Sequence, residues 1–297
     1  MAVGLAAQLG GEIISADSRQ VFRGMDIGTG KDLSEYDVTA ADGSTRHIPC
    51  HLIDIAEPGT KYSVFEFQRD FMRACYNIGT RARIPILCGG TGLYIESVLR
   101  GYQLAEVPVN QPLRDELEGK SLEELTQILA SYKRLHNTTD VDTARRAIRA
   151  IEIEEYYRSH GLSHSAENPD KSFPATFLTF GLSVPRELRR QRITARLHHR
   201  LEQEGMLDEV QRLLDNGISP ESLISYGLEY RYLTLHLLGQ LSYDEMVRQL
   251  EIAIHQFAKR QMTYFRGMER RGVHIQWIDA TRPREEVVKE ILGKIEK

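Results

Sequence analysis

Residues 12–20 read EIISADSRQ, a short apolar run that leads directly into a Ser-Ala-Asp turn. Two further runs, HLIDI at 51–55 and IPILC at 84–88, are also short and apolar and are bounded by Gly, Pro or Asp. Strands that are buried on both faces of a parallel sheet show this nearly continuous apolar pattern. The first third of the chain is therefore predicted to be α/β, with these three runs as parallel strands.

A helix is predicted to begin after Ser63. Ser63 and Glu66 have the spacing of a capping box, in which each side chain accepts a hydrogen bond from the backbone N–H of the other residue. Apolar residues then recur at helical intervals, at positions 64, 67, 71, 75 and 78. This pattern places Cys75 in the hydrophobic core.

The strand pattern stops at about residue 108 and returns at 176. Residues 108–174 carry amphipathic helical patterns and are predicted to form an inserted helical subdomain. Residues 1–107 and 175–297 are predicted to form the α/β core. In its second part we expect strands at 176–182 and 274–278, and helices at 185–204, 206–214 and 243–266.

The composition excludes several classes of protein. With 297 residues, a net charge of −4, 41% hydrophobic and 27% charged residues, the chain has ordinary globular usage, which argues against a disordered or fibrous protein. Apolar stretches of the roughly 20 residues that span a bilayer and a secretory signal pattern are both missing, so we expect a cytoplasmic protein without membrane contact. The cysteines, Cys50, Cys75 and Cys88, lack zinc-site spacing, and we identify no metal ligands.

Asp17 directly follows the first predicted strand. In open parallel sheets the carboxyl ends of the strands face the ligand crevice, so a carboxylate there can act as a base or accept a hydrogen bond from a substrate. The structural alternative is that Asp17 or Ser18 caps a following helix. The local sequence leaves both interpretations open.

The segment CGGTGLY at 88–94 is rich in glycine and follows another predicted strand. Its backbone N–H groups can approach a phosphate or diphosphate at the start of a helix, but a simple tight turn is the alternative. The Thr91 hydroxyl either binds an oxyanion or caps the helix. GTGK at 28–31 does not fit the P-loop pattern, because Asp32 replaces the Ser or Thr that would bind magnesium, and we interpret it as a surface loop.

Basic residues gather on three predicted helices. They are Arg189, Arg192, Arg196 and Arg200 on one, Arg145, Arg146 and Arg149 on a second, and Lys259, Arg260, Arg266, Arg270 and Arg271 on a third. A single cluster of this kind is usually a solvated face with salt bridges. Three clusters in a chain of net negative charge favour a segregated surface for a nucleic acid or a phosphate.

Several strings, in a fixed order along most of the chain, resemble the tRNA dimethylallyltransferase family. They are EIISADSRQVFRGMDIGT at 12–29, HLID at 51–54, YSV at 62–64 with Phe67, RIPIL at 83–87, GGTGLY at 89–94, RRAIRAIE at 145–152 and AKRQMTYFR at 258–266. The first string is long and specific. The KRQ-x-T-x-F-R pattern is nearly diagnostic beside it.

The resemblance implies a P-loop NTPase-like parallel sheet core with an inserted helical subdomain that binds the anticodon stem-loop. It also implies an enzyme that transfers a dimethylallyl group from dimethylallyl diphosphate to N6 of the adenosine 3′ to the anticodon, with Mg²⁺ assisting the diphosphate. By position, Asp17 matches the general base and Thr91 a threonine near the flipped adenosine. Arg192 matches an arginine on the diphosphate, and Arg196, one turn away, is the alternative.

The same resemblance implies the tRNA contacts and the partners. The matching positions are Asp17, Ser18, Arg19, Gln20, Thr91, Arg114, Arg145, Arg146, Ala147, Ile148 and Arg149. The partners are tRNA and dimethylallyl diphosphate, and the protein is expected to be a monomer. The chemistry agrees, because an exocyclic adenine amine is a poor nucleophile that a positioned carboxylate activates after the base has left its stack.

The sequence departs from the family pattern in two places. The family opens with an apolar strand and a Walker-A loop of the GPTxxGKT kind before a helix like that at 2–9, whereas this sequence begins with Met1 at that helix. We expect the true start to lie upstream and the neighbouring strands to expose apolar side chains. The alternatives are a non-catalytic tRNA-binding paralogue or truncated form, and a small-molecule kinase. At 226–231, YGLEYR replaces the more usual Gly-Tyr-Lys/Arg turn.

Overall fold

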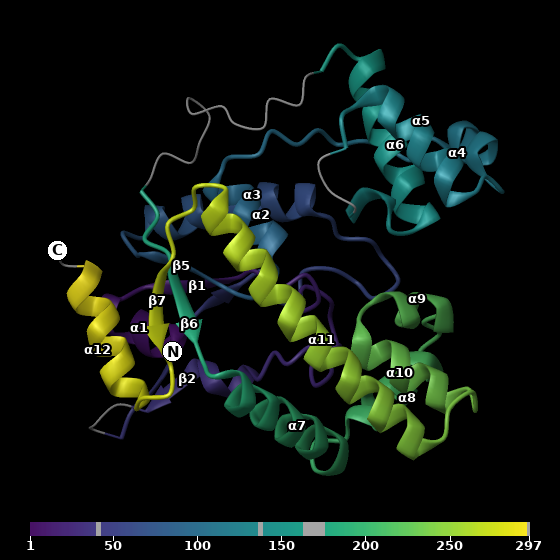
Figure 1. Cartoon of the computed structure of the whole chain (residues 1–297). Coiled ribbons are helices and arrows are strands. Elements are labelled where there is room, and N and C mark those ends of the chain that lie inside the picture. The colour runs from purple at the N-terminus through teal and green to yellow at the C-terminus, as the bar shows by residue number, and fades with distance from the viewer. Residues whose placement is uncertain (40–42, 136–138, 163–175, 296–297) are drawn as a thin grey trace. The chain divides into compact units, whose positions relative to one another are not determined.

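The computed structural model describes residues 1–39, 43–135, 139–162 and 176–295 (Figure 1). The chain divides into two compact units. Met1–Arg100 and Phe173–Lys297 form the first, which we call the sheet unit, and Gly101–Ser172 form the second, which we call the helical unit. Each unit contains its own hydrophobic cluster.

A parallel sheet lies at the centre of the sheet unit. Its strands, in spatial order, are β4 (Cys50–His51), β1 (Glu12–Ser15) and β5 (Pro85–Cys88). In the middle strand, Ile13 is paired with Cys50 on one side and with Ile86 on the other, and all four residues of β1 are buried. A second parallel pair consists of β6 (Phe180–Ser183) and β7 (Gln276–Asp279). These pairings confirm the predicted α/β class with parallel strands.

Nine helices are described in the sheet unit. They are α1 (Ala2–Leu9), α2 (Val64–Thr80), α3 (Gly92–Leu99), α7 (Arg186–Glu202), α8 (Met206–Asp215), α9 (Pro220–Ser225), α10 (Leu228–Leu237), α11 (Tyr243–Arg270) and α12 (Arg284–Ile295). The capping box of Ser63 and Glu66 at the start of α2 is present as predicted. Phe67 and Cys75 on α2 are buried in one cluster with Ile14 of β1, which confirms the predicted core position of Cys75.

A second core of the sheet unit joins the loop after β1 to the C-terminal helices. Met25 of that loop, Val210 of α8, Leu233 of α10 and Leu250 of α11 are all buried in it. Helix α11 also packs against α3 and α7, and Figure 1 shows it running alongside α7 and α10. The loop after β1 is therefore fixed between the sheet and these helices.

The edge strands of the sheet are less buried than β1. The residues of β5 are exposed or half-buried, and Ile84, just before this strand, is 46% exposed. On β6, Leu182 is 43% exposed. Apolar side chains next to β5 and on β6 therefore meet solvent, in agreement with the expectation from the sequence.

The predicted strand at 51–55 is wrong beyond its first residue. β4 ends at His51, because Leu52 and Asp54 have φ values of 62° and 55°. These values lie in the left-handed region, which interrupts extended backbone. Asp54 consequently lies in a loop and not in a strand.

Other boundaries also differ from the prediction. The strands expected at 176–182 and 274–278 are observed as β6 and β7, which begin later in the sequence. The sequence patterns did not predict the 3-10 helix η1 (Leu33–Tyr36), nor the antiparallel hairpin of β2 (Asp37–Thr39) and β3 (Thr45–His47) that follows it. Strands of three residues are too short to give a periodic pattern.

The helical unit is built from α4 (Gln111–Leu117), α5 (Leu122–Tyr132), η2 (Thr139–Val141) and α6 (Ala144–Ser159). Asn110 caps α4, and Ser121 forms a capping box with Glu124 at the start of α5. Helices α5 and α6 pack together through Leu125 and Ile151, which are fully buried. In both units, none of the described helices combines the length and the apolar character needed to cross a bilayer.

Candidate functional site

Asp17 lies in the turn that leaves the carboxyl end of β1. Its Oδ1 accepts hydrogen bonds from the backbone N–H groups of Arg19 (2.8 Å) and Gln20 (3.4 Å). Asp17 thus caps a turn and not a helix, and its Oδ2 has no hydrogen-bond partner among the described residues. Burial raises the pKa of the Asp17 carboxyl, against the opposing effect of the two N–H groups. A fixed carboxylate with a raised pKa has the properties of a general base.

Thr91 meets the Asp17 turn from the other side. Its backbone N–H donates to the carbonyl oxygen of Ala16 at 3.1 Å, and its Oγ1 accepts from the backbone N–H of Ser18 at 3.0 Å. The hydroxyl does not cap α3, so that alternative is wrong. A Cβ on Gly89 would lie 2.4 Å from the Ala16 carbonyl oxygen, so this glycine is required by close packing.

Charged side chains from three elements surround the Asp17 turn. Arg19 belongs to the turn, Arg196 to α7, and Glu229 to the first turn of α10. A Cβ on Gly227 would lie 3.9 Å from Arg19 Nε and 4.0 Å from Glu229 Oε2, so these two side chains flank the same glycine. Burial lowers the pKa of Arg19 and Arg196 and raises the pKa of Glu229, on which the charges of Arg196 and Asp17 have opposite effects. Asp17, Arg19 and Glu229 are half-buried and Arg196 is exposed, and we call these four groups the charged region.

Glu229 was missed in the sequence. The only signal for it is the departure from the family turn at 226–231, where an acidic residue stands two positions after Gly227. That departure indicated altered contacts, but it did not show that the charges of Asp17 and Arg196 act on the Glu229 carboxylate. This relationship depends on packing between segments that are distant in the sequence.

The predicted arginine face of α7 is divided between surface and interior. Arg200 is 7% exposed and donates to the Asp32 carboxylate at 2.8 and 3.0 Å, so its predicted place on an exposed basic face is wrong. The negative charges of Asp32 and Glu229 raise the pKa of Arg196, against the larger effect of burial. Arg192 is exposed, with no ion pair among the described residues. Of the two arginines considered for the diphosphate, only Arg196 lies in the charged region.

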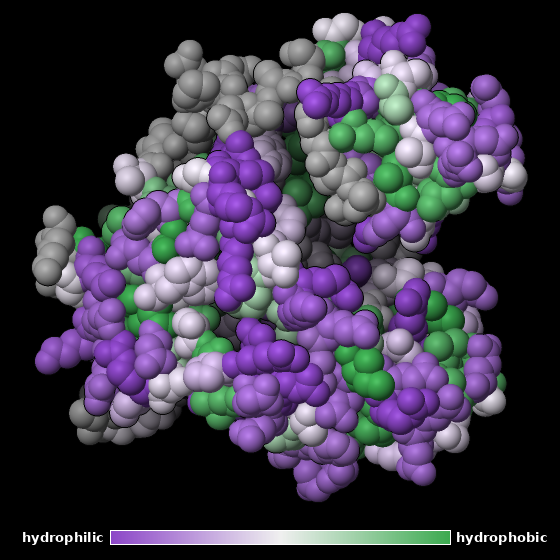
Figure 2. All heavy atoms as spheres, in the orientation of Figure 1, coloured by the Kyte–Doolittle hydropathy of each residue, from purple (hydrophilic) through white to green (hydrophobic). Residues whose placement is uncertain are grey.

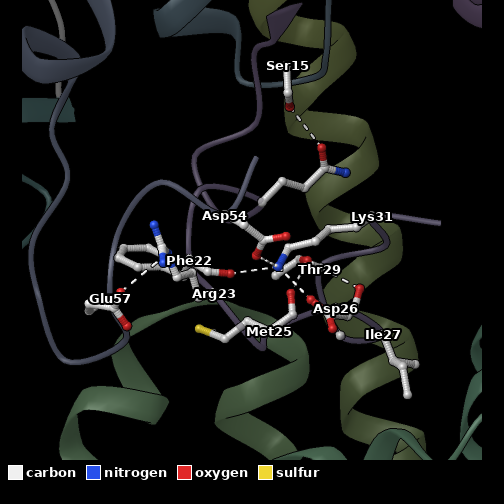
Figure 3. A network of polar contacts seen from close by, with 12 residues as sticks. Ser15, Phe22, Arg23, Met25, Asp26, Ile27, Thr29, Lys31, Asp54 and Glu57 are labelled. Atoms are coloured by element: carbon white, nitrogen blue, oxygen red, sulfur yellow. Dashed lines mark hydrogen bonds and ion pairs between the residues drawn. The ribbon is translucent and has the colours of Figure 1, made fainter. Parts of the chain in front are cut away.

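The interpretation of residues 28–31 as a surface loop is wrong. The Lys31 side chain is completely buried, and its Nζ donates to the Phe22 carbonyl oxygen at 2.7 Å. Its Nζ also donates to the carboxylates of Asp26 and Asp54, at 2.6 and 2.5 Å, and Figure 3 shows these three side chains together. A buried ammonium is tolerated only with such partners. The sequence pattern around Lys31 does not show which oxygen atoms bind its ammonium group.

Arg114 and Arg149 come together in the helical unit. Arg114 Nε and Nη2 donate to Glu152 at 3.0 and 2.9 Å, and Arg149 Nη1 donates to the same carboxylate at 2.5 Å. Glu152 also accepts from the backbone N–H of Asn110 at 2.6 Å and is 1% exposed. Burial raises the pKa of Glu152, but the arginines and this N–H outweigh it and lower the pKa to about 2. These two predicted tRNA contacts therefore also organise the unit.

The remaining predicted tRNA contacts on α6 have different environments. Arg145 and Arg146 are exposed, and Arg146 is paired with Asp142 at 2.5 Å. Ala147 is fully buried in the core cluster, and Ile148 packs against it. Contact with a ligand through the Ala147 side chain is excluded by this burial.

A third basic surface lies on α11. Lys259, Arg260, Arg266 and Arg270 are exposed on this helix, and Figure 2 shows hydrophilic side chains over its C-terminal end. Lys259 and Arg260 line a pocket with Gln256, Thr263 and Tyr264. Arg271 differs, because it donates two hydrogen bonds to the buried Glu96 at 2.6 and 2.8 Å.

No metal site is formed by side chains alone within the described residues, since these contain no group of three or more His, Cys, Asp or Glu side chains placed to hold a metal ion. Magnesium bound with a diphosphate takes many of its ligands from phosphate oxygens and water, and needs few protein ligands.

Comparison with known proteins gave consistent matches over nearly the whole chain. The IPP transferase family model matches residues 20–268. The chain is 61% identical over 287 residues to tRNA dimethylallyltransferase 1 of Parabacteroides distasonis. This match covers 97% of this chain and 90% of that protein.

Solved structures match as well. A full-length tRNA isopentenylpyrophosphate transferase from Bacillus halodurans has a TM-score of 0.67 at 31% identity, covering 99% of this chain and 90% of that one. A eukaryotic dimethylallyltransferase, solved acting on tRNA, has a TM-score of 0.72 at 19% identity. The match covers 99% of this chain and 74% of that chain and shows the same fold. The predicted P-loop NTPase-like class is thereby confirmed. Given the length and identity of these matches, the chain belongs to the IPP transferase family.

Proposed function

We propose that this protein transfers a dimethylallyl group from dimethylallyl diphosphate to N6 of the adenosine 3′ to the anticodon in tRNA. The observation that carries this proposal is the environment of Asp17. One carboxylate oxygen is fixed by two N–H groups, the other is free of partners among the described residues, and the pKa is raised by burial. The names of close relatives support the same activity.

The proposed reaction is a substitution at the allylic carbon. The adenine N6 forms a bond to that carbon while the bond between the carbon and the diphosphate oxygen breaks. The N6 proton passes to Asp17 Oδ2, and the diphosphate leaves with the bonding electron pair. Thr91 and Ser18 fix the turn on which Asp17 lies, and Arg196 is placed to stabilise the negative charge that grows on the diphosphate.

Binding of tRNA is assigned to two surfaces. The first surface, in the helical unit, consists of the exposed arginines of α6 together with Arg114 and Arg149 around Glu152. The second surface, in the sheet unit, is the exposed basic end of α11, with Lys259 and Arg260. Arginine and lysine side chains on such surfaces hold the phosphate backbone of RNA without reading its sequence. The reacting adenine has to leave its stack to reach Asp17.

Dimethylallyl diphosphate, magnesium and the monomeric state complete the proposal. We assign magnesium to the diphosphate as a complex, in which it neutralises charge on the leaving group, because the described side chains form no metal site of their own. No step in the mechanism is routed through it. Sedimentation of the protein alone at a mass near 33.9 kDa is expected for a monomer.

The test is a transfer assay with three components. The protein is incubated with dimethylallyl diphosphate, magnesium and an unmodified anticodon stem-loop, and the RNA is digested and analysed by mass spectrometry. Appearance of N6-dimethylallyladenosine at the position after the anticodon supports the proposal. RNA binding without this product identifies a non-catalytic RNA-binding protein, and turnover of a nucleoside triphosphate identifies a kinase.

A further inference from the structure

The side chain of Gln20 is held at both ends inside the protein. Its Nε2 donates to the Gly30 carbonyl oxygen at 2.9 Å, and its Oε1 accepts from Ser15 Oγ at 2.8 Å. Figure 3 labels Ser15, the donor of the second bond, which ends β1. These two bonds use one of the two amide hydrogens and one of the two oxygen lone pairs and hold the side chain in place inside the protein, although Gln20 matches a tRNA contact by position.

The backbone of Gln20 is also engaged on both sides. Its N–H donates to Asp17 Oδ1 at 3.4 Å, and its carbonyl oxygen accepts from the Asp54 N–H at 3.2 Å. Gln20 is thus the residue through which the Asp17 turn is connected to the loop of Asp54. A shift of Gln20 has to move the N–H that helps to orient the Asp17 carboxylate.

Lys31 is connected to both residues that hold Gln20, namely Gly30 and Asp54. It is adjacent in sequence to Gly30, whose carbonyl oxygen holds the Gln20 amide. Its Nζ also binds the carboxylate of Asp54, whose N–H holds the Gln20 carbonyl oxygen. The Lys31 side chain has no exposed surface, whereas those of Asp26 and Asp54 are 51% and 37% exposed. The ammonium is therefore the buried centre of this hydrogen-bond network, to which the more exposed carboxylates of Asp26 and Asp54 bind.

Glu209 of α8 holds the same segment from the opposite side. Its carboxylate accepts from the backbone N–H groups of Asp26, Ile27 and Gly28 at 2.8, 2.8 and 3.0 Å, and from the Tyr230 hydroxyl at 2.6 Å. The loop is bound at its N–H groups by Glu209 and at its oxygen atoms by Lys31. With both sides engaged, the Gly30 carbonyl oxygen has one defined position.

We infer that Lys31 and Gln20 are positioning residues, which orient the Asp17 carboxylate for proton removal through this chain of hydrogen bonds. The inference rests on the general-base role given to Asp17 in the proposed function. It assigns to Gln20 an internal role in place of an RNA contact. It also gives a purpose to a lysine whose side chain is completely buried.

The experiment uses the full chain and two variants, Lys31→Met and Gln20→Leu. Both replace the side chain by an apolar one of similar size and remove its polar contacts, and the half-exposed Asp26 and Asp54 remain hydrated when the lysine is lost. The controls are Lys294→Met, which removes an ion pair with Glu290, and Gln211→Leu, which removes a hydrogen bond to Asp215. Circular dichroism first establishes that each variant is folded.

The measurements are kcat, KM, the Kd for the stem-loop, and exchange of the Arg19 amide, whose N–H donates to Asp17. We expect both variants to lose protection of this amide and to lose about 10²-fold in kcat, with KM, Kd and both controls near wild type. Unchanged protection overturns the inference whether or not the protein transfers a prenyl group. Weaker RNA binding at unchanged kcat in Gln20→Leu also overturns it. Absence of product from wild type contradicts the proposed function, while the amide exchange still decides the positioning.

Discussion

The Oγ1 of Thr91 accepts a hydrogen bond of 3.0 Å from the backbone N–H of Ser18, 73 residues earlier in the chain. This contact joins the glycine-rich turn after β5 to the Asp17 turn after β1. A second bond between the same turns runs from the Thr91 N–H to the Ala16 carbonyl oxygen at 3.1 Å. The carboxyl ends of two neighbouring strands are thereby locked together at the proposed site of chemistry.

Replacing Thr91 by Val should loosen this contact, because the isosteric side chain cannot accept the Ser18 N–H. An N–H group that loses its partner in a half-buried site costs about 1 kcal/mol of stability. We expect a lower melting temperature and a reduced kcat, measured by thermal unfolding and by the transfer assay. Thr91→Ser keeps the hydroxyl and should retain most of both. A Ser variant that is impaired while the Val variant stays near wild type would show that the methyl group, not the hydrogen bond, matters.

Asp17→Asn tests the general base. The Asn Oδ1 can still accept the N–H groups of Arg19 and Gln20, so the turn should persist while the ability to take a proton is lost. We expect kcat to fall by about 10²-fold or more and the Kd for the stem-loop to remain unchanged. An equal loss of kcat and of RNA affinity would contradict the role given to Asp17.

The pH dependence of Asp17 has a defined sign. Burial raises the pKa of this carboxyl, so the ionised base is lost at a higher pH than in an exposed aspartate. The acid limb of the kcat profile should therefore lie above the ordinary aspartate range. For stability, a raised folded-state pKa favours folding at low pH, and this contribution disappears as the pH rises through it. Asp17→Asn should accordingly not lower the free energy of unfolding at neutral pH.

Arg196 and Arg192 form a matched pair of variants on one helix. Both side chains are exposed, but the negative charges of Asp32 and Glu229 raise the pKa of Arg196, whereas Arg192 has no ion pair among the described residues. We expect Arg196→Gln to reduce kcat by about 10²-fold, the usual loss when one stabilising group for developing charge is removed. Arg192→Gln should stay close to wild type in the same steady-state assay. The reverse order would identify Arg192 as the arginine on the diphosphate.

Local patterns predicted those parts of the fold that local physics decides. The strand at 12–15 and the helix after Ser63 were correct, because continuous apolar character and a capping box act within a few residues. The strand at 51–55 failed, since Asp54 takes a left-handed conformation within a network that holds Lys31. Lys31 was likewise predicted to be exposed, because the partners that allow its burial are brought to it by tertiary packing and not by the local sequence.

The candidate site was predicted to a similar extent. The position of Asp17 after a strand made it a candidate, because strand ends in parallel sheets face ligands, and its role as a base stays a prediction. Glu229 was not identified, and neither was Glu209, which accepts the Asp26 N–H from 183 residues later in the chain. Pairings over such distances have no signature in one sequence. They become visible only when the fold brings the segments together.

Glu152 should control the stability of the helical unit. It is 1% exposed and binds Arg114, Arg149 and the Asn110 N–H. Glu152→Ala leaves these donors without their acceptor and should cost about 2 kcal/mol, measured by urea unfolding. Because the pKa is lowered from 4.5 to about 2, the contribution is complete above pH 4.5 and is lost as the pH falls toward 2. A variant whose stability follows the wild-type curve through this window would exclude that role.

Arg145 offers the cleaner test of RNA contact by α6, because Arg149 also stabilises the helical unit. Arg145 is exposed, with no ion pair among the described residues, so Arg145→Gln should leave the melting temperature unchanged. A phosphate contact contributes about 0.7 to 0.9 to the slope of log K against log salt. We therefore expect weaker stem-loop binding at low salt and a slope reduced by about this amount, measured by fluorescence anisotropy across a salt series. Arg212→Gln on α8 serves as the exposed control and should keep the wild-type slope. An unchanged slope in Arg145→Gln would remove this residue from the RNA surface, because neutralising a bound phosphate without changing counterion release is not physically possible.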